Sequence, residues 1–278
     1  MNAAAKNARE LIAFYLDAGV DVLLDEESVD RFADEVITSR QVRDGPVPPT
    51  VPSPDRLRRT GLPVPDEGKT PVQAPPPVPE AAIMAAREAA GGAQTLDELR
   101  ALLDAFEGCM LRATATQLVF AAGNPAARVM FVGEAPGRDE DISGVPFVGR
   151  SGQLLDRMMA AIGLDRGSAY IANVVPWRPP GNRTPTPQET AICLPFIRRQ
   201  IELADPDILV CLGQPATQTL LGTKEGITRT RGRWLKFDTG TREIAALATY
   251  HPAFLLRSPL QKRLAWRDFL ALKKALVQ

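Results

Sequence analysis

Hydrophobic and polar residues follow two different patterns in the second half of the chain. Short continuous apolar runs, the first at residue 129, alternate with segments in which apolar residues recur every three or four positions. The runs predict strands at 129–132, 170–175, 208–212 and 244–249, and the segments predict helices at 151–162, 187–203, 215–221 and 260–277. Such alternation is typical of a parallel sheet covered on both faces. We therefore expect a three-layer α/β domain with its ligand at the carboxyl ends of the strands.

The N-terminal part of the chain has a different organisation. Helical periodicity extends over 3–17, and 28–36 resembles a second short helix. This piece is too small for a core of its own, so we expect it to pack on something else or on a partner. Further helices are predicted at 80–90 and, from a capping box at Thr95, towards Phe106.

Proline separates these two parts. Of the 25 prolines, 12 lie between Pro46 and Pro79. Because proline lacks an amide donor and disfavours helix in the residue before it, this stretch cannot build a packed core. We predict a linker at 45–79, between an acidic helical extension at 1–44 and the α/β domain at 80–278. A ligand for a proline-recognising domain is the alternative interpretation of the linker.

The formal charge is zero only as an average, because 33 basic residues balance 33 acidic ones over all 278 positions. Residues 1–110 hold 11 basic and 19 acidic side chains, whereas residues 111–278 hold 22 basic and 14 acidic ones. The basic half therefore fits a phosphate backbone as partner, with a solvated surface as the alternative. Its last part is especially basic, with Arg229, Arg231, Arg233, Arg257, Lys262, Arg263 and Arg267 close together.

Cysteine and histidine counts limit the chemistry further. Three widely spaced cysteines do not form a disulfide framework, so we expect a reducing compartment and a cytoplasmic location. No apolar run approaches the length of a membrane span, and no secretory pattern opens the chain. A single histidine, His251, excludes metal sites that need two histidines, and we expect no metal among the site residues.

Three loops at predicted strand ends carry the candidate chemistry. Gly133 and the acidic segment after it contain neither a dinucleotide fingerprint nor a P-loop. Their carboxylates suit water positioning, proton transfer or cation stabilisation, and a tight turn with a solvated acidic edge is the alternative. Asn173 ends the second strand and His251 follows the fourth. Either could be structural, as a turn former or a core histidine, but both lie at the ligand end of the sheet.

Together these loops resemble family 4 uracil-DNA glycosylases. The motifs, in order, are Gly133-Glu-Ala-Pro-Gly137 with Pro146-Phe-Val-Gly149, Asn173 with Arg178-Pro-Pro-Gly-Asn-Arg183, and His251-Pro-Ala-Phe-Leu-Leu-Arg257. The resemblance covers roughly residues 105–275. It implies an αβα sandwich with a four-stranded parallel sheet, which flips uracil out of DNA and hydrolyses its N-glycosidic bond.

The resemblance also assigns roles to individual residues. Asn173 would read the uracil edge, since its amide matches the N3–H and O4 groups and not those of cytosine. His251 would donate to uracil O2, where negative charge builds as the bond breaks. Glu134 is the first candidate for activating the water and Glu140 the second. The base would also contact Gly133, Ala135 and Phe147, and the DNA would contact Arg183, Leu255, Leu256, Arg257, Lys262 and Arg263.

One departure concerns the iron–sulfur cluster that members of this family typically hold on four cysteines. The matching positions are Phe106, Cys109, Trp177 and Cys193, so two ligands are replaced by aromatic residues. We expect no cluster, with the two rings packed in its place. Cys211 lies on a predicted central strand, where a small buried hydrophobe is the better interpretation.

The hypothesis is a monofunctional uracil-DNA glycosylase, acting on uracil-containing DNA and leaving an abasic site, as a monomer without a membrane partner. Covalent trapping of the product by a histidine in the loop 179–184 is excluded, because the only histidine lies elsewhere. A binder of uracil- or abasic-site DNA that lost turnover is the alternative. An interaction module fits only the N-terminal extension and linker.

Overall fold

The computed structural model describes residues 80–277. The predicted extension at 1–44 and linker at 45–79 lie outside the described residues. The helix expected at 80–90 is present as α3 (Glu80–Gly92). Half of the capping box expected before α4 (Leu96–Ala105) is formed: Glu98 N donates to Thr95 Oγ1 at 3.1 Å, but the Glu98 carboxylate accepts from Gln94 N at 2.7 Å and not from Thr95 N. These two helices begin the α/β domain.

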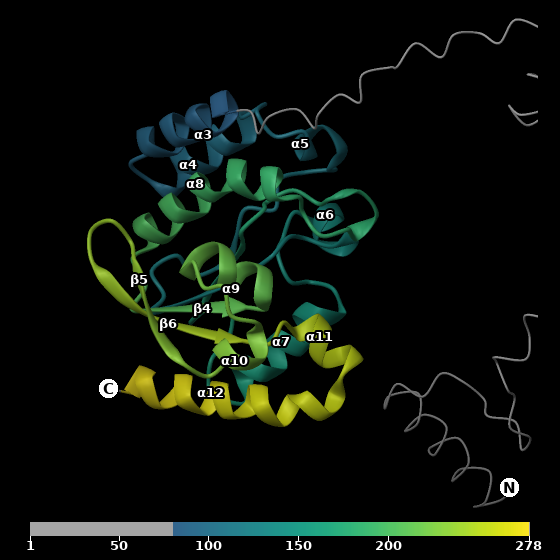
Figure 1. Ribbon diagram of the computed structural model, residues 1–278, viewed down its shortest axis with the longest axis vertical. Helices are drawn as coiled ribbons and strands as arrows, with labels where there is room; N and C mark the ends of the chain where they lie inside the picture. Colours follow the sequence, from purple (N-terminus) through teal and green to yellow (C-terminus); the bar gives the residue numbers. More distant parts are fainter. Residues whose placement is uncertain (1–79, 278) are drawn as a thin grey trace, which may run out of the picture. The chain divides into compact units, whose positions relative to one another are not determined.

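The sheet of this domain has six strands in the order β1-β3-β2-β4-β6-β5 (Figure 1). The inner four are parallel and correspond to the strands expected from the sequence. A short strand pairs antiparallel at each edge, so the expectation of a four-stranded sheet is corrected to six strands of mixed direction. The bounds are β1 Ala122–Gly123, β2 Val129–Gly133, β3 Tyr170–Asn173, β4 Ile208–Leu212, β5 Trp234–Asp238 and β6 Glu243–Thr249.

Two apolar cores cover the two faces of this sheet. Residues of β2 point alternately to either side: Met130 and Val132 pack under one set of helices, and Val129 and Phe131 under the other. Every residue of β2, β3 and β4 is buried, as expected of parallel strands covered on both faces. The three layers that the sequence predicts are therefore present.

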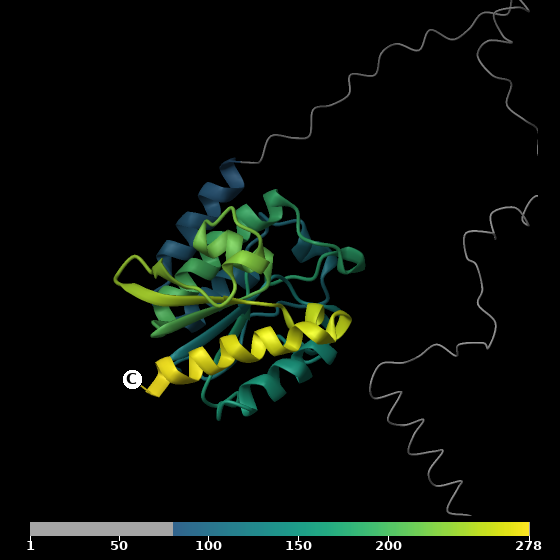
Figure 2. The ribbon, with the colours of Figure 1, turned by 60° about the horizontal axis from the view of Figure 1, so that its bottom comes forward.

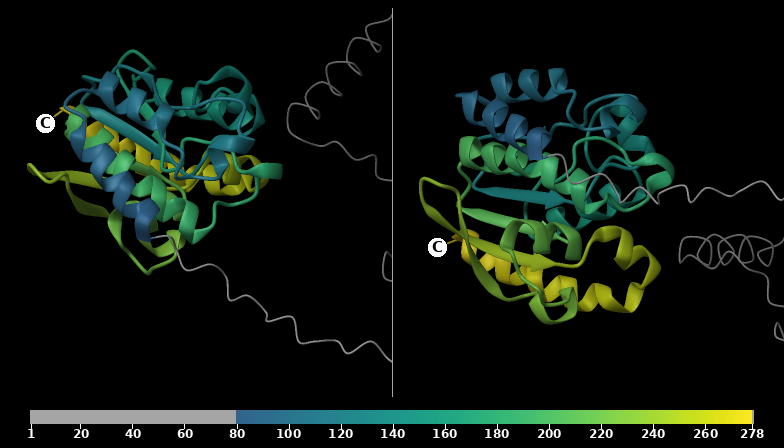
Figure 3. Two further views of the ribbon diagram at one scale, coloured as in Figure 1. Left: turned by 90° about the horizontal axis from the view of Figure 1, so that it is seen from above. Right: turned by 45° about the horizontal axis from the view of Figure 1, so that its top comes forward.

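The helices divide between the faces accordingly. The first core packs against α3, α4, α8 and α9, and the second against α7 and α12. Figure 2 shows α12 and α7 together below the sheet, and the right-hand view of Figure 3 shows α3, α4 and α8 above it. The remaining bounds are α5 Leu111–Thr114, α6 Arg138–Ser143, α7 Arg150–Ala160, α8 Pro187–Ala204, α9 Gln214–Leu221, α10 Ile227–Thr230, α11 Pro252–Arg257 and α12 Lys262–Val277, with single 3-10 turns at Pro180–Asn182 and Pro259–Gln261.

Parallel pairing brings the carboxyl ends of four strands to one edge of the sheet. Gly133 pairs with Asn173 across β2 and β3, and Leu212 pairs with Thr249 across β4 and β6. The loops that follow these positions therefore meet beside one another. Among the helices of residues 80–277, none has the length and apolar character needed to cross a membrane.

Candidate active site

A cavity of about 680 Å³ lies where the four parallel strands end. Each strand contributes one polar wall residue: Glu134 follows β2, Asn173 ends β3, Gln214 follows β4 and His251 follows β6. Phe147 adds an aromatic wall from the loop between α6 and α7. Residues separated by more than a hundred positions thus share one site, because the sheet aligns the strand ends.

Asn173 lies at the bottom of the cavity with only 4% of its surface exposed. A Cβ atom at position 133 would lie 2.5 Å from Asn173 Oδ1, so the absence of a side chain at Gly133 makes room for this amide. Asn173 Oδ1 is buried and accepts no hydrogen bond within the described residues. A buried acceptor without a partner costs free energy unless a ligand supplies the donor.

Glu134 supplies a second acceptor of the same kind. Its Oε1 atom is buried without a hydrogen-bond donor, and these two oxygens are the only such side-chain atoms found in residues 80–277. Burial raises the pKa of Glu134, and the Thr184 hydroxyl opposes this shift. The cavity therefore presents two acceptors that a donor-bearing ligand or water can satisfy.

His251 caps the N-terminus of α11. The backbone N–H of Ala253 donates to His251 Nδ1 at 3.1 Å, so in the neutral ring the proton resides on Nε2. Burial, with a smaller contribution from Arg257, lowers the pKa of His251 to about 4. At neutral pH this side chain is therefore an uncharged donor. Its side chain lies against Gly213, where an added Cβ atom would be 2.9 Å from His251 Cβ.

Phe147 forms the wall beside these polar groups. Its ring centroid lies 5.6 Å from that of His251 at an interplanar angle of 33°. A Cβ atom at position 133 would be 2.6 Å from Phe147 Cζ, so the ring also uses the space that Gly133 leaves. The side chain is 4% exposed, and Phe147 is one of the residues that line the cavity.

Glu140 lines the same cavity but is occupied by the loop that carries Phe147. Its Oε1 accepts from Val148 N at 3.0 Å and Gly149 N at 2.9 Å, and its Oε2 accepts from Gly137 N at 3.1 Å. Three backbone donors thus use the carboxylate that the sequence offered as a second water activator. In the structure the Glu140 side chain therefore connects the segment at Gly137 to the loop at Val148 and Gly149.

This arrangement can be compared with known proteins. A family model for the uracil DNA glycosylase superfamily matches residues 120–270, which include all six strands and the five wall residues. The chain belongs to this superfamily. The resemblance found in the sequence motifs is therefore confirmed at the level of the family.

The chain matches type-4 uracil-DNA glycosylases over most of their length. The type-4 uracil-DNA glycosylase of Archaeoglobus fulgidus is 39% identical over 180 residues, which are 63% of this chain and 90% of the relative. That of Thermotoga maritima is 44% identical over 151 residues, 54% of this chain and 77% of the relative. That of Sulfurisphaera tokodaii is 37% identical over 185 residues, which are 65% of this chain and 84% of the relative.

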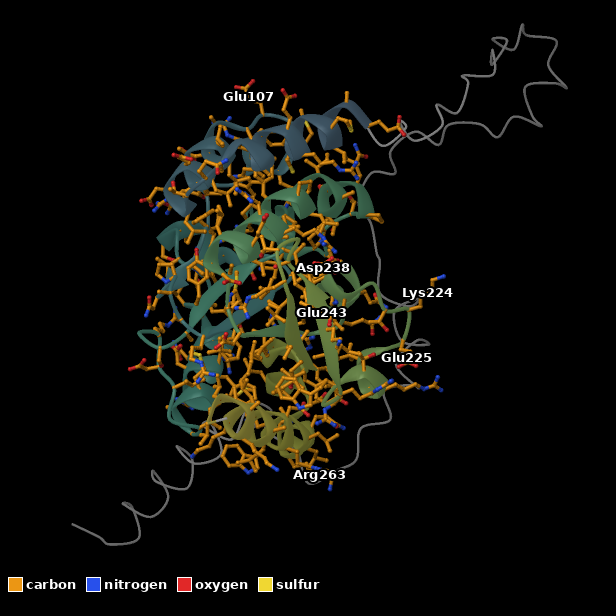
Figure 4. The ribbon with its side chains drawn as sticks, turned by 90° about the vertical axis from the view of Figure 1, so that its left-hand side faces the viewer. Glu107, Lys224, Glu225, Asp238, Glu243 and Arg263 are labelled. Atoms are coloured by element: carbon orange, nitrogen blue, oxygen red, sulfur yellow. The ribbon has the colours of Figure 1, made fainter. Side chains whose placement is uncertain are left out.

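Of the six expected DNA-contacting residues of this superfamily member, five are exposed, and Arg183 is one of them. The other four are Leu256, Arg257, Lys262 and Arg263, and Figure 4 shows Arg263 on the outer side of α12. Leu255 is 1% exposed and packs with Tyr250 and Ala265, so the prediction that it contacts DNA is wrong.

Arg183 is exposed and has a partner within the protein. Its guanidinium donates to Glu189 Oε1 at 2.6 Å and Oε2 at 2.8 Å. This two-bond ion pair lowers the pKa of Glu189 and fixes the loop before α8. The charge of Arg183 is therefore balanced within the protein.

The structure also brings forward residues that sequence reasoning missed. Thr184 and Tyr250 line the cavity, and Leu260 is 84% exposed beside the basic start of α12. Arg138 and Arg150 line a groove of about 480 Å³ next to the cavity, and Gly137 and Arg257 line both the groove and the cavity. None stands out in sequence, because its significance depends on exposure and on neighbours from other segments.

The positions matching the cluster cysteines lie in one apolar core. Trp177 is 2% exposed, and Phe106 packs edge-on against Phe196 with ring centroids 5.1 Å apart. The neighbouring Cys109 thiol and burial raise the pKa of Cys193 well above its usual value. Two aromatic side chains and a protonated thiol do not fit a cluster that needs four thiolates. Cys211 is fully buried on β4, as predicted, and burial raises its pKa to about 12.

Proposed function

We propose that the protein is a monofunctional uracil-DNA glycosylase, which hydrolyses the N-glycosidic bond of a uracil flipped out of DNA and leaves an abasic site. The observation that carries this is the set of polar groups in one cavity: two buried acceptors without donors, and one neutral imidazole donor. The family and the activity of its type-4 relatives support the same conclusion.

Asn173 selects the base in this proposal. Uracil N3–H would donate to the buried Oδ1, and the amide nitrogen would donate to uracil O4. Cytosine carries an acceptor at N3 and a donor at C4, so neither hydrogen bond would form in a site that holds the amide in one orientation. Phe147 would stack on the ring, which adds affinity for any base more than choice among bases.

His251 and Glu134 act on the bond. As the C1′–N1 bond breaks, its electron pair stays on the base, and the His251 Nε2–H would stabilise the negative charge at uracil O2. Water would attack C1′ with Glu134 accepting its proton. Glu140 is assigned to positioning, because its oxygens already accept three backbone N–H groups.

The DNA would run along the exposed basic rim beside the cavity. Leu256 would fill the space that the flipped nucleotide leaves, next to Arg257, Lys262 and Arg263. Arg138 and Arg150 would extend this rim along the neighbouring groove. We assign the catalytic role to residues 80–278, as a cytoplasmic monomer that releases or weakly holds abasic-site DNA.

We also propose that the domain holds no iron–sulfur cluster. Phe106 and Trp177 fill the core where two of the four ligands would be, and so stabilise it by apolar packing. Protein purified without oxygen should contain iron and sulfide far below one cluster per chain. A stoichiometric cluster would contradict this assignment.

Cleavage of single- and double-stranded uracil DNA tests the function directly. Alkali treatment should reveal abasic sites with the wild-type protein and with residues 80–278 alone, and Asn173→Ala should remove most activity by leaving the base edge without its partner. Leu102→Ala, on the exposed side of α4, is the control. Tight binding without any cleavage would instead support the alternative, a binder of uracil- or abasic-site DNA.

A further inference from the structure

Phe147 has a backbone conformation that its residue type disfavours. Its φ angle is +57°, in the left-handed region that glycine, asparagine and aspartate adopt most readily. The other non-glycine residues with positive φ in 80–277 are Asn182 and Asp205, which belong to those tolerant types. A bulky aromatic residue keeps such a conformation only where its surroundings hold it.

Arg166 holds the carbonyl side of this residue. From the loop after α7, its Nη1 donates to Pro146 O at 3.2 Å and its Nη2 donates to Phe147 O. Its Nε donates to Asp156 Oδ1 at 2.9 Å, and Asp156 belongs to α7. One guanidinium therefore ties two successive carbonyls of the pocket loop to a packed helix.

The approach of α7 fits this arrangement. A Cβ atom at position 152 would lie 1.8 Å from Phe147 O, so only glycine permits α7 to pass here. On the other side of Phe147, Glu140 accepts from the N–H groups of Val148 and Gly149. The peptide around Phe147 is thus held from both directions.

We propose that Arg166, anchored by Asp156, is a positioning residue that keeps Phe147 in the left-handed conformation and thereby sets the place of its ring in the base pocket. Arg166 does not line the cavity and acts through Phe147 alone. The effect on uracil binding rests on the proposed function. The effect of Arg166 on the position of the Phe147 ring is independent of that function.

The first test measures the inhibition constant of free uracil together with kcat/KM. Arg166→Ala should weaken uracil inhibition and lower kcat/KM by about tenfold each, because the ring is no longer fixed. Lysine cannot reproduce the fork, so Arg166→Lys should fall between alanine and wild type. Asp156→Asn should act in the same direction with a smaller effect.

A double variant separates positioning from general stability. Adding Arg166→Ala to Phe147→Ala should cause no further decrease, because the ring through which Arg166 acts is already absent. The matched control is Arg242→Ala, since Arg242 also binds main-chain carbonyls and a carboxylate, at Asp205 and Pro206 away from the cavity. It should leave uracil inhibition unchanged. Independent, multiplying decreases in the double variant would overturn the proposal.

A second readout needs no activity. In aromatic NMR spectra, with Phe147 assigned from Phe147→Leu, the Phe147 ring signals should shift or broaden in Arg166→Ala while those of Phe237 stay in place. An unchanged Phe147 ring would overturn the positioning role even in an active enzyme. Displaced ring signals in a protein that neither binds nor cleaves uracil would support the positioning role and contradict the proposed function.

Discussion

Neutrality of the imidazole at position 251 defines how the site can respond to pH. Burial disfavours the charged ring and lowers its pKa to about 4, while the Ala253 N–H fixes the tautomer. A neutral donor can strengthen its hydrogen bond as charge grows on the base, and it carries no charge that must first be desolvated. Glu134 is shifted the other way, because burial also disfavours its carboxylate.

These two shifts predict the pH profile of kcat/KM. Activity should rise with pH through one acidic limb, with a midpoint above the ordinary pKa of glutamate, because the raised pKa of Glu134 delays formation of the base. His251 should add no limb between pH 6 and 8, since its pKa is about 4.

Two variants check the assignment of that limb. Glu134→Gln should remove the limb and about a hundredfold of the rate. His251→Asn should lower the rate at every pH while the limb keeps its midpoint. A midpoint near 6.5 that disappears with His251→Asn would show that a charged histidine is used.

The sequence predicted those cavity residues that lie at the end of an apolar strand. Asn173 and His251 could be found because apolar strands stop there, and the cavity indeed contains both. The hydrogen bonds of Glu140 and Arg183 could not be predicted from the sequence, because each depends on the path of a loop that brings its partner within 3 Å. The left-handed Phe147 is invisible for the same reason.

Helix α11 places two adjacent leucines in different environments, one in the core and one at the surface. Leu255 is 1% exposed, whereas Leu256 is 36% exposed and lies beside the groove of Arg138 and Arg150. In a helix of only six residues the sequence pattern cannot tell which leucine faces inward. The expectation that both leucines contact DNA follows from the resemblance to the family, which covers the motif as a whole.

The two leucines should therefore respond differently to substitution by alanine. Leu255→Ala should lower the free energy of unfolding by about 3 kcal/mol, as expected for a buried leucine. Leu256→Ala should leave stability nearly unchanged and lower activity on duplex substrates more than on single strands. Thermal unfolding and cleavage rates measure both, and equal decreases in stability would contradict this division.

The strands illustrate the same limit of sequence patterns. The inner strands are continuous apolar runs because both of their faces are buried, so their positions could be predicted. Strand β5 alternates exposed and buried residues in a five-residue stretch, and β1 has two residues. Such edge strands form through pairing with a neighbour that is already in place, which a local pattern does not report.

Across the whole domain, ion pairing divides the arginines into two groups. Arg128, Arg183, Arg231 and Arg242 are each paired with carboxylates. Within residues 80–277, no ion pair includes Arg138, Arg150, Arg257 or Arg263. The second group gathers beside the cavity and along the start of α12, so net charge understates the field that DNA would meet.

Salt dependence of DNA binding can distinguish the two groups. Alanine at Arg138, Arg150 or Arg257 should weaken duplex binding and reduce the slope of log K against log salt by about 0.9 for each phosphate that is no longer neutralised. Arg128→Ala, which removes a paired arginine, should leave the slope unchanged. Fluorescence anisotropy over a range of salt concentrations gives both quantities, and a shared decrease would contradict the division.

The pocket also has a thermodynamic consequence for the protein without substrate. Two buried oxygens have no donor among the described residues, and unless water or a ligand supplies one they make the domain less stable than its packing would allow. Selection for robustness alone would replace Asn173 with an apolar residue, and the chain would gain stability as it lost the ability to choose a base. Base discrimination and resistance to heat are therefore opposing demands on the same atoms.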